Sequence, residues 1–305
     1  MRNATNIIDL SVIIVNYNTR EYLKGCLKSI LNQPGVKFET IVIDNNSVDE
    51  SSQMVAKEFP QVKLISNREN LGFGKANNQA LKICNGKYVY FLNPDTVAEP
   101  NCFIKMFQFM EANPDIGLAG TKMLFPDHSF HPSTGDGYPG GRRARNAMPE
   151  LPGDIAWVLG ASMIAPLEVI NSVHGFDERF FLYGEEQDLC LRIRKSGLRI
   201  GYIPEAVVIH WGGKSERNNP PVDVWAKKIK AEYLFYNKHY PESTVWAIRR
   251  ADFIQACWRT FSLYLTLPLT KDKETHKNKL AKYSQVLKIS RSGLNPSKAP
   301  DPPDY

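Results

Sequence analysis

Short apolar runs alternate with segments of helical periodicity through the first third of the chain. The continuous apolar runs, which predict buried strands, cover residues 10–15, 40–44, 62–66 and 88–92. The amphipathic segments, which predict helices, cover about 20–31, 49–59 and 75–84. This alternation predicts an α/β fold with a mostly parallel central sheet flanked by helices. Ligands of such sheets bind at the carboxyl ends of the strands, where several polar motifs of this chain fall.

The pattern changes after Gly120. Residues 125–153 are rich in Gly, Pro, Arg and His without a clear period, which is typical of a functional or mobile loop. Beyond that loop we expect an ordered apolar segment over 155–165, helices over 166–173 and 185–195, and a strand pair over 198–210. After Pro220 the sequence predicts helix to about Leu265, and the last residues have the composition of a disordered tail.

Composition and charge narrow the class of protein and its partners. The 305 residues are 43% hydrophobic and 23% charged, as in ordinary folded proteins. The net charge is +6. Basic residues concentrate in the C-terminal third, at Arg249, Arg250, Arg259, Lys271, Lys273, Lys277, Lys279 and Lys282. This asymmetry favours an anionic partner such as phospholipid, polyprenyl diphosphate or nucleic acid, unless it is only a solvated basic face.

Cysteines and apolar stretches bear on the compartment. The five cysteines have no C-x-x-C spacing and are odd in number, so a reducing environment is expected. The first residues lack the apolar core of a secretory signal. No window reaches about 18 uncharged apolar residues, the length expected of a membrane span. We therefore expect a cytoplasmic protein, with the inner face of the cell membrane as a further possibility.

Asp95 is a candidate metal ligand. It stands in Asn93-Pro94-Asp95-Thr96, directly after an apolar strand and before a helix expected to begin near Glu99. Mg²⁺ or Mn²⁺ takes one or two carboxylates and leaves its other positions to water and phosphate. The alternative is a simple turn in which Asp95 caps the following helix.

Three acids crowd into the start of the second predicted helix beyond the loop: Glu185, Glu186 and Asp188. The helix dipole favours negative charge there, so capping is one interpretation. Mutual repulsion would raise the pKa of at least one of them toward the range of a general base. Residues two apart on a helix diverge, so one can reach a substrate while the other pairs with Arg192, Arg194 or a backbone amide.

His210 closes an apolar strand and precedes Trp211-Gly212-Gly213-Lys214-Ser215. The glycines would allow the backbone to approach a phosphate whose charge Lys214 could balance. His210 is then a candidate second metal ligand beside Asp95. A structural histidine at a strand end is the alternative.

Gly72-Phe73-Gly74, followed by a helix, resembles part of a dinucleotide-binding fingerprint. That fingerprint requires G-x-G-x-x-G after the first strand. Here Asn77 occupies the third glycine position, and the motif follows the third predicted strand. A dehydrogenase is therefore not expected, although the start of this helix remains suited to contact with an anion.

Six motifs in order identify a family. They are Val-Ile-Ile-Val-Asn-Tyr-Asn, Ile-Val-Ile-Asp-Asn-Asn-Ser, Asn-Leu-Gly-Phe-Gly-Lys-Ala-Asn-Asn, Leu-Asn-Pro-Asp-Thr, Gly-Phe-Asp-Glu-Arg-Phe-Phe and His-Trp-Gly-Gly-Lys-Ser. In this combination, between Ser11 and about Ser215, the chain resembles the inverting family 2 glycosyltransferases with the GT-A (Rossmann-like) fold. Within them it is similar to bacterial rhamnosyltransferase-like enzymes of cell-surface polysaccharide assembly.

The resemblance implies roles for single residues. Donor-binding roles pass to Tyr17, Asp44, Asn70, Gly72, Asn77, Asn93, Asp95 and Lys214. Tyr17 would stack on the base of the nucleotide and Asp44 would hydrogen-bond it. Asp95 matches the last carboxylate of the family's D-x-D element, which begins here with Asn93, and His210 matches a histidine near metal and diphosphate.

The resemblance also implies the base and the reaction. The family's Glu-Asp pair aligns with Glu185-Glu186, which makes Glu186 the expected base and Asp188 the second candidate. A glycan or polyprenyl-diphosphate-linked hydroxyl would displace the nucleoside diphosphate of dTDP-rhamnose, or otherwise of a UDP-sugar. A sugar-nucleotide nucleotidyltransferase and a non-catalytic carbohydrate- or lipid-binding protein are the alternatives.

The expected domains follow from this family. Residues 1–218 would form the GT-A domain, with a nucleotide-binding half over about 8–120 and an acceptor and catalytic half over about 121–218. A helical extension would span 219–270 and a basic, partly disordered tail 271–305.

The helical extension suggests contact with an anionic membrane. Aromatic residues alternate with basic ones there, as in an interfacial helix: Trp246, Phe253, Trp258, Phe261 and Tyr264 with Arg249, Arg250 and Arg259. Packing on the catalytic domain or against the partner in a homodimer is the alternative. Nucleic acid is not expected as a partner of the enzyme.

Overall fold

The computed structural model describes residues 8–144, 147–214, 220–270 and 272–292. They form two compact units, of which the first contains residues 8–138, 151–181 and 185–214 and the second the other described residues. Some predictions concern positions outside the described residues: Ser215, the boundary at 218 and 219, Lys271 and the tail over 293–305.

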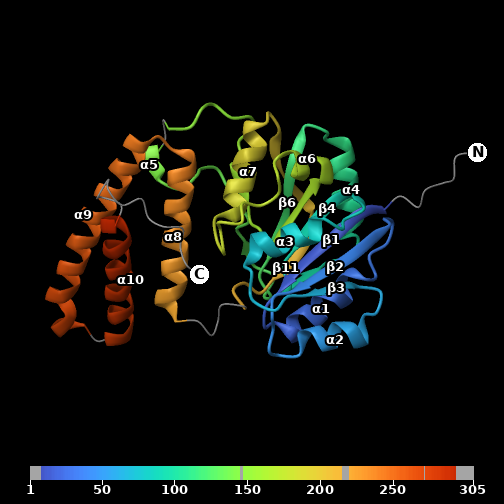
Figure 1. The fold of residues 1–305 in the computed structure, drawn as a ribbon, viewed down its shortest axis with the longest axis horizontal. Helices are drawn as coiled ribbons and strands as arrows, with labels where there is room; N and C mark the ends of the chain where they lie inside the picture. The colour runs from blue at the N-terminus through green and yellow to red at the C-terminus, as the bar shows by residue number, and fades with distance from the viewer. Residues whose placement is uncertain (1–7, 145–146, 215–219, 271, 293–305) are drawn as a thin grey trace, which may run out of the picture. The chain divides into compact units, whose positions relative to one another are not determined.

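The first half of the sheet has the predicted alternation (Figure 1). Its elements in chain order are β1 Ile8–Asn16, α1 Arg20–Ile30, β2 Phe38–Asp44, α2 Ser51–Glu58, β3 Lys63–Ser66, α3 Phe73–Leu81 and β4 Gly86–Leu92. β1 pairs in parallel with both β2 and β4, and β2 pairs in parallel with β3. The carboxyl ends of these four strands therefore meet at one edge of the sheet.

The second half completes a mixed sheet with the order β3-β2-β1-β4-β10-β6-β11-β5, in which β7 (Phe130–His131) also pairs with β6. β10 is antiparallel to both β4 and β6, and β11 is parallel to β6. β6 and β11 thus run with the first four strands, and the mostly parallel sheet is confirmed. The elements are β5 Thr96–Ala98, α4 Cys102–Ala112, β6 Ile116–Leu124, β10 Ser162–Pro166, α6 Leu167–Ser172, α7 Glu185–Lys195 and β11 Arg199–His210.

Three buried hydroxyls join the middle strands. Ser162 Oγ lies 2.7 Å from Tyr90 Oη and 2.6 Å from Thr121 Oγ1. The three residues belong to β10, β4 and β6. This hydroxyl chain links the antiparallel strand to both parallel neighbours inside an otherwise apolar layer.

Three details of the second half differ from prediction. Residues 199–210 form one strand, β11, instead of a strand pair, and its pairing with β6 is irregular between Ile203 and Val207. Pro204 lies in that irregularity and cannot donate a ladder hydrogen bond. The short strand β5 follows Asp95, so helix α4 begins at Cys102 instead of near Glu99.

Strand β6 was not predicted, because glycines weaken its apolar pattern. A Cβ atom at Gly117 would lie 2.5 Å from Ile193 Cγ2 of α7. One at Gly120 would lie 2.7 Å from Val158 Cβ. Both glycines therefore allow neighbouring elements to approach the strand closely.

The predicted loop over 125–153 contains short elements. They are β7 Phe130–His131, β8 Thr134–Gly135 and α5 Gly141–Ala144, and β8 pairs with β9 Trp157–Val158. β7 is antiparallel to the end of β6. The loop is thus anchored to the sheet through β7.

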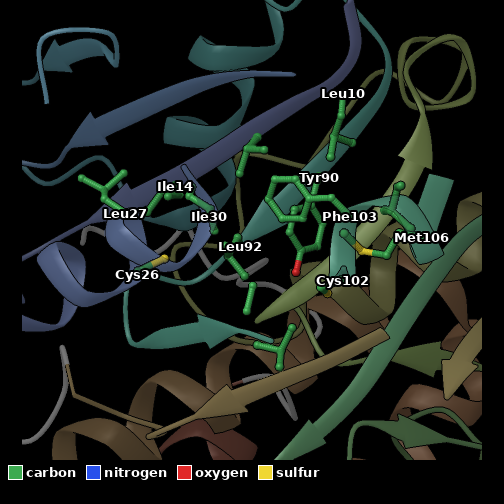
Figure 2. Packing of buried hydrophobic residues seen from close by; sticks show 14 of the residues in the cluster. Leu10, Ile14, Cys26, Leu27, Ile30, Tyr90, Leu92, Cys102, Phe103 and Met106 are labelled. Carbon is green, nitrogen blue, oxygen red and sulfur yellow. The ribbon is translucent and has the colours of Figure 1, made fainter. Parts of the chain in front are cut away.

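Helices cover both faces of the sheet. One buried cluster joins β1 and β4 to α1, α2 and α4, and Figure 2 shows part of its packing, including Leu27, Tyr90 and Phe103. The other cluster joins the opposite faces of these strands to α3, α6 and α7. Successive residues of β1 alternate between the clusters, as Val12 and Ile13 do, which is the strand periodicity that the sequence contains.

The second unit is largely helical. Its long helices are α8 Pro221–His239, α9 Glu242–Thr266 and α10 Lys273–Ser292, with the short 3₁₀ turn η1 Leu267–Leu269. The C-terminal helical extension is confirmed, and α10 is a helix that the sequence did not predict. In the part of the chain that the structure describes, no helix is both long and apolar enough to cross a membrane.

Candidate active site

The ends of β4 and β11 bring Asp95 and His210 together. His210 Nε2 lies 3.4 Å from Asp95 Oδ1, and the Trp211 amide donates a 3.0 Å hydrogen bond to the Asp95 carbonyl. Both side chains are buried. The two residues are 115 positions apart, so the sheet topology creates this pair.

Backbone geometry brings Lys214 back to the same carboxylate. Gly212 and Gly213 have φ values of 65° and 64°, in the left-handed region that favours glycine. After this turn the Lys214 amide lies 3.4 Å from Asp95 Oδ2, and the Lys214 ammonium lies 5.7 Å from the centre of the Tyr22 ring. The backbone of Lys214 thus lies at Asp95, while its ammonium lies over the Tyr22 ring.

His210 has unused hydrogen-bonding capacity. Neither ring nitrogen has a hydrogen-bond partner, although both atoms are buried. Buried polar atoms normally find partners, and unpaired ones often mark a ligand site. Within the described residues no group of three or more His, Cys, Asp or Glu side chains is placed to hold a metal ion. The chemistry of one carboxylate and one imidazole nevertheless fits a cation that takes its other ligands from phosphate and water.

His131 is a residue that sequence analysis missed. Its ring centre lies 5.1 Å from that of His210 and 4.3 Å from that of Phe125. His131 Nδ1 lies 3.0 Å from the Pro132 carbonyl. The aperiodic loop gave no sign of this contact, and only the pairing of β7 with β6 creates it. The His131 ring thus covers part of the His210 ring at a tilt of 35°.

Glu186 and the loop that carries Asp95 both contact the short segment of residues 160 and 161, directly before β10. A Cβ atom at Gly160 would lie 3.6 Å from Glu186 Cβ. The next residue, Ala161, accepts a 2.9 Å hydrogen bond from the Asn93 amide. The half-buried Glu186 and the loop bearing Asp95 therefore contact the same short segment of chain.

The other two acids of the cluster are buried. Asp188 is fully buried and accepts a 2.8 Å hydrogen bond from Arg192 Nε, one of the pairings expected for it. Burial raises the pKa of Glu185 well above its ordinary value, and the adjacent charge of Glu186 adds to the shift. Oε2 of Glu185 has no hydrogen-bond partner. Repulsion was expected to raise one pKa in this cluster, but burial is the larger cause.

The ends of β1 and β2 carry the predicted base-binding residues. Asp44 is 3% exposed; its Oδ1 accepts a 2.8 Å hydrogen bond from Asn16 Nδ2, and its Oδ2 accepts one from the Ser47 amide. Tyr17 is the first residue after β1, and its side chain is half-buried. Asn16, which the sequence analysis did not select, orients the carboxylate of Asp44.

Strand β3 leads into a loop that hydrogen bonds fix in place before α3. The Gly72 amide donates to Asn70 Oδ1, and the Phe73 amide donates to the Phe181 carbonyl. Gly72 has a φ of 79°, and a Cβ atom there would lie 2.5 Å from that carbonyl. Asn77 is buried, and its amide group donates to the Phe73 carbonyl of its own helix. Asn70 and Gly72 therefore lie in the loop before α3, whereas Asn77 is tied within the helix.

Two family models match the chain. "Glycosyl transferase family 2" matches residues 11–160, and "Glycosyl transferase family group 2" matches residues 88–269. The sheet and its flanking helices have the GT-A fold. The chain belongs to the family 2 glycosyltransferases.

Relatives of known name agree with this assignment. The N-acetylglucosaminyl-diphospho-decaprenol L-rhamnosyltransferase of Mycobacterium tuberculosis is 26% identical, with 74% of this chain and 83% of that protein covered. Rhamnosyltransferase WbbL of Escherichia coli is 26% identical, with 68% and 85% covered. The chain is thus similar to rhamnosyltransferases over most of their length.

Solved structures share the fold at low sequence identity. The mannosyltransferase PcManGT from Pyrobaculum calidifontis, in complex with GDP-Man and Mn²⁺, has a TM-score of 0.55 at 15% identity, covering 95% of this chain and 88% of its own. S. aureus TarS 1-349 in complex with UDP-GlcNAc has a TM-score of 0.55 at 17% identity, covering 93% and 91%.

Proposed function

We propose that this glycosyltransferase inverts the anomeric centre while moving rhamnose from dTDP-rhamnose to a hydroxyl of a lipid-linked glycan. The names of the Mycobacterium tuberculosis and Escherichia coli relatives support rhamnose as the sugar. The name of the former also supports a polyprenyl-diphosphate-linked acceptor. Such an acceptor makes the inner face of the cell membrane the expected place of action, in cell-surface polysaccharide synthesis.

One observation carries the proposal. Glu186 lies against Gly160, and Ala161 is hydrogen-bonded to Asn93, two residues before Asp95. The stem of the Glu186 side chain and the turn that carries Asp95 thus border one segment. This supports direct displacement, in which a base and a group that stabilises the leaving diphosphate must belong to one active site.

Glu186 is the proposed base. Its carboxylate takes the proton of the acceptor hydroxyl, whose oxygen bonds to the anomeric carbon. The bond from that carbon to the diphosphate oxygen breaks, and the nucleoside diphosphate leaves with the electron pair. A single attack opposite the leaving group inverts the configuration. Asp188, fully buried, is assigned to orienting Arg192, whose Nη1 donates a hydrogen bond to the Val173 carbonyl outside α7.

Tyr17 and Asp44 are proposed to hold the base of the nucleotide at the ends of β1 and β2, and Lys214 to contact the diphosphate. Asp95 and His210 are proposed to hold Mg²⁺ or Mn²⁺, a choice supported by the Mn²⁺ bound to PcManGT. The cation would supply charge stabilisation for the leaving diphosphate. His210 keeps its unpaired nitrogens available for this role.

A donor screen tests the proposal. Purified protein is given dTDP-rhamnose or a UDP-sugar with Mg²⁺ or Mn²⁺, without and with a lipid-linked glycan acceptor, and the released nucleotide and the glycosylated acceptor are identified by chromatography. We expect dTDP from dTDP-rhamnose, loss of release in Asp95→Ala, and a transfer rate reduced about 10²–10⁴-fold in Glu186→Gln. Glu205→Gln, the same change at an exposed position of β11, is the matched control and should keep the wild-type rate.

Other outcomes separate the alternatives. Release of pyrophosphate from a nucleoside triphosphate would identify a nucleotidyltransferase. A transfer rate retained in Glu186→Gln would remove the base assignment. Retention of the anomeric configuration, measured by NMR of the product, would exclude direct displacement.

A further inference from the structure

The exposed apolar side chains concentrate on helix α9. Six of the ten large hydrophobic side chains exposed in the described residues belong to it: Trp246, Ile254, Trp258, Phe261, Tyr264 and Leu265. At 3.6 residues per turn these positions fall within an arc of about 120°. The buried residues Val245 and Ala256 lie on the other side of the helix. Soluble proteins seldom expose so continuous an apolar stripe without a binding partner.

The structure also separates the inward from the outward residues of α9. Arg249 is 6% exposed, and its guanidinium lies 4.8 Å from the centre of the Tyr233 ring. Phe253 is partly buried. Three residues of the expected membrane-facing set differ from prediction. Arg249 is buried, so its assignment is wrong, and Phe253 is only partly exposed. Arg259 is exposed but lies outside the apolar arc. The outward set, called here the α9 outer face, consists of Trp246, Arg250, Ile254, Trp258, Phe261, Tyr264 and Leu265.

Charge distinguishes the possible occupants of the α9 outer face. Arg250 lies within the apolar arc, with its guanidinium 5.5 Å from the centre of the Trp246 ring. Together α9 and α10 carry nine Lys and Arg against three Asp and Glu. No acid falls within the arc: Glu242 starts the helix, and Asp252 accepts a 2.9 Å hydrogen bond from Tyr233 Oη of α8. A second copy of this face would bring only like charge to Arg250, whereas an anionic lipid surface would neutralise it.

We propose that the α9 outer face docks on an anionic lipid bilayer. The aliphatic and phenyl groups enter the boundary of the acyl chains, and the indole and phenol rings lie at headgroup level, where amphipathic aromatic side chains are favoured. Arg250 extends its charged end to the phosphates while its stem covers apolar surface. The inference deepens the proposed function, because a lipid-linked acceptor is presented at such a surface.

Vesicle flotation of the full chain tests the inference. The vesicles contain phosphatidylcholine alone or with phosphatidylglycerol, at low and high salt. The variant Ile254→Glu/Trp258→Glu places two carboxylates on the α9 outer face. The control Gln255→Glu/Thr266→Glu places the same charge at exposed positions outside the arc. We expect the wild type to float with anionic vesicles and the first variant to bind them at least tenfold more weakly. The affinity of the control should stay within about threefold of wild type, because its added charges lie outside the α9 outer face and salt screens their effect at a distance.

Quenching by lipids that carry a spin label on the headgroup gives a second measurement. Trp246 and Trp258 should be quenched on binding, and Trp258→Phe should float normally with reduced quenching. The inference is overturned if the wild type does not float, or if the control loses binding as strongly as the variant. It is also overturned if the wild type is a dimer that the variant dissociates, because the face would then join two copies. Flotation uses no donor, so failure of the glycosyl transfer assay would leave this result standing.

Discussion

The half-buried Glu39 and the buried Glu185, at different places in the first unit, have opposite electrostatic environments. Glu39 lies near the start of β2, where the amino ends of the strands meet. Burial raises the pKa of Glu39, but hydrogen bonds from Lys63, Ser11 and Asn85 outweigh it and hold the pKa below its ordinary value. Glu185, at the start of α7, has no such donors at Oε2, and burial raises its pKa well above the ordinary value.

The amino edge of the sheet is internally satisfied. Glu39 accepts 2.6 Å hydrogen bonds from Lys63 Nζ and Ser11 Oγ, and a 2.7 Å bond from the Asn85 amide. Ser11 Oγ in turn accepts a 2.9 Å bond from the Gly86 amide. This network joins the first residues of four neighbouring strands, β1 to β4, and Glu39 accepts several hydrogen bonds within it.

At the carboxyl side of the first unit, some buried polar atoms have no hydrogen-bond partner. Both nitrogens of His210 and Oε2 of Glu185 are buried without hydrogen-bond partners. Leaving such groups unpaired costs about 1–3 kcal/mol each, so the fold gains stability at the amino edge and gives some up here. The comparison predicts that substitutions at the two edges separate stability from activity.

The largest effect is expected for His210→Phe. The aromatic ring can keep its stacking against His131, but the nitrogens are lost. Under the proposed function the transfer rate should fall about 10²–10³-fold. The melting temperature should change little, because removing polar atoms without hydrogen bonds offsets the loss of the 3.4 Å contact with Asp95 Oδ1. Calorimetry beside the donor assay measures both, and a large loss of stability would show that His210 is a structural residue.

Next in size is Glu39→Ala at the amino edge. Lys63, Ser11 and Asn85 would lose their acceptor, and the free energy of unfolding should decrease by about 2–3 kcal/mol. The transfer rate of the folded enzyme at low temperature should stay within about twofold of wild type. Urea unfolding followed by circular dichroism measures the first quantity. A rate that fell together with stability would contradict the separation of the two edges.

Glu185→Gln should have an effect that depends on pH. Because the folded-state pKa of Glu185 is raised, the folded protein retains a proton that the unfolded chain releases. Wild-type stability therefore decreases as pH rises above the ordinary glutamate value of about 4.5, until the folded-state pKa is passed. The amide variant cannot ionise, so its melting temperature minus that of wild type should increase from pH 4 to pH 8. A difference that is constant over this range would show that Glu185 is not protonated in the folded state.

The smallest effect is expected for Ser11→Ala. Glu39 would lose one of several donors, and the Gly86 amide would lose its acceptor, at a cost of about 1 kcal/mol in unfolding free energy. Activity should not change. A decrease as large as that of Glu39→Ala would mean that Ser11, and not the carboxylate, organises the amino edge.

Sequence patterns predicted the sheet where local signals were strong. β1 to β4 and their helices follow apolar runs and helical spacing, and α7 has the predicted bounds at Glu185 and Lys195. β6 was missed because Gly117 and Gly120 serve contacts with other elements and not the strand's own pattern. The continuity of β11 through Pro204 was missed because only its pairing with β6 maintains it.

The candidate site was predictable to the same degree. Asp95 and His210 were selected as a pair, and the structure places them in contact. The contact of Asp188 with Arg192 was among the expected pairings, because helical spacing determines it. His131 could not be selected, since its place beside His210 depends on how an aperiodic loop pairs with the sheet. Roles in catalysis remain proposals that the variants above test.

The hydrogen-bonded hydroxyl groups of Tyr90, Ser162 and Thr121 help to align the loop after β4 with the loop before β10. Contacts between apolar side chains have no strong directional preference, so a shift or substitution costs them little free energy. A hydrogen bond between hydroxyl groups is lost when a strand shifts by one residue, because every side chain then moves to the other face of the sheet. Ser162 directly follows Ala161, and Tyr90 stands three residues before Asn93. The three hydroxyl groups therefore fix the register of β4, β10 and β6. Mutation of the surrounding apolar side chains can reduce packing density while the loops at Asn93 and Ala161 keep their relative positions.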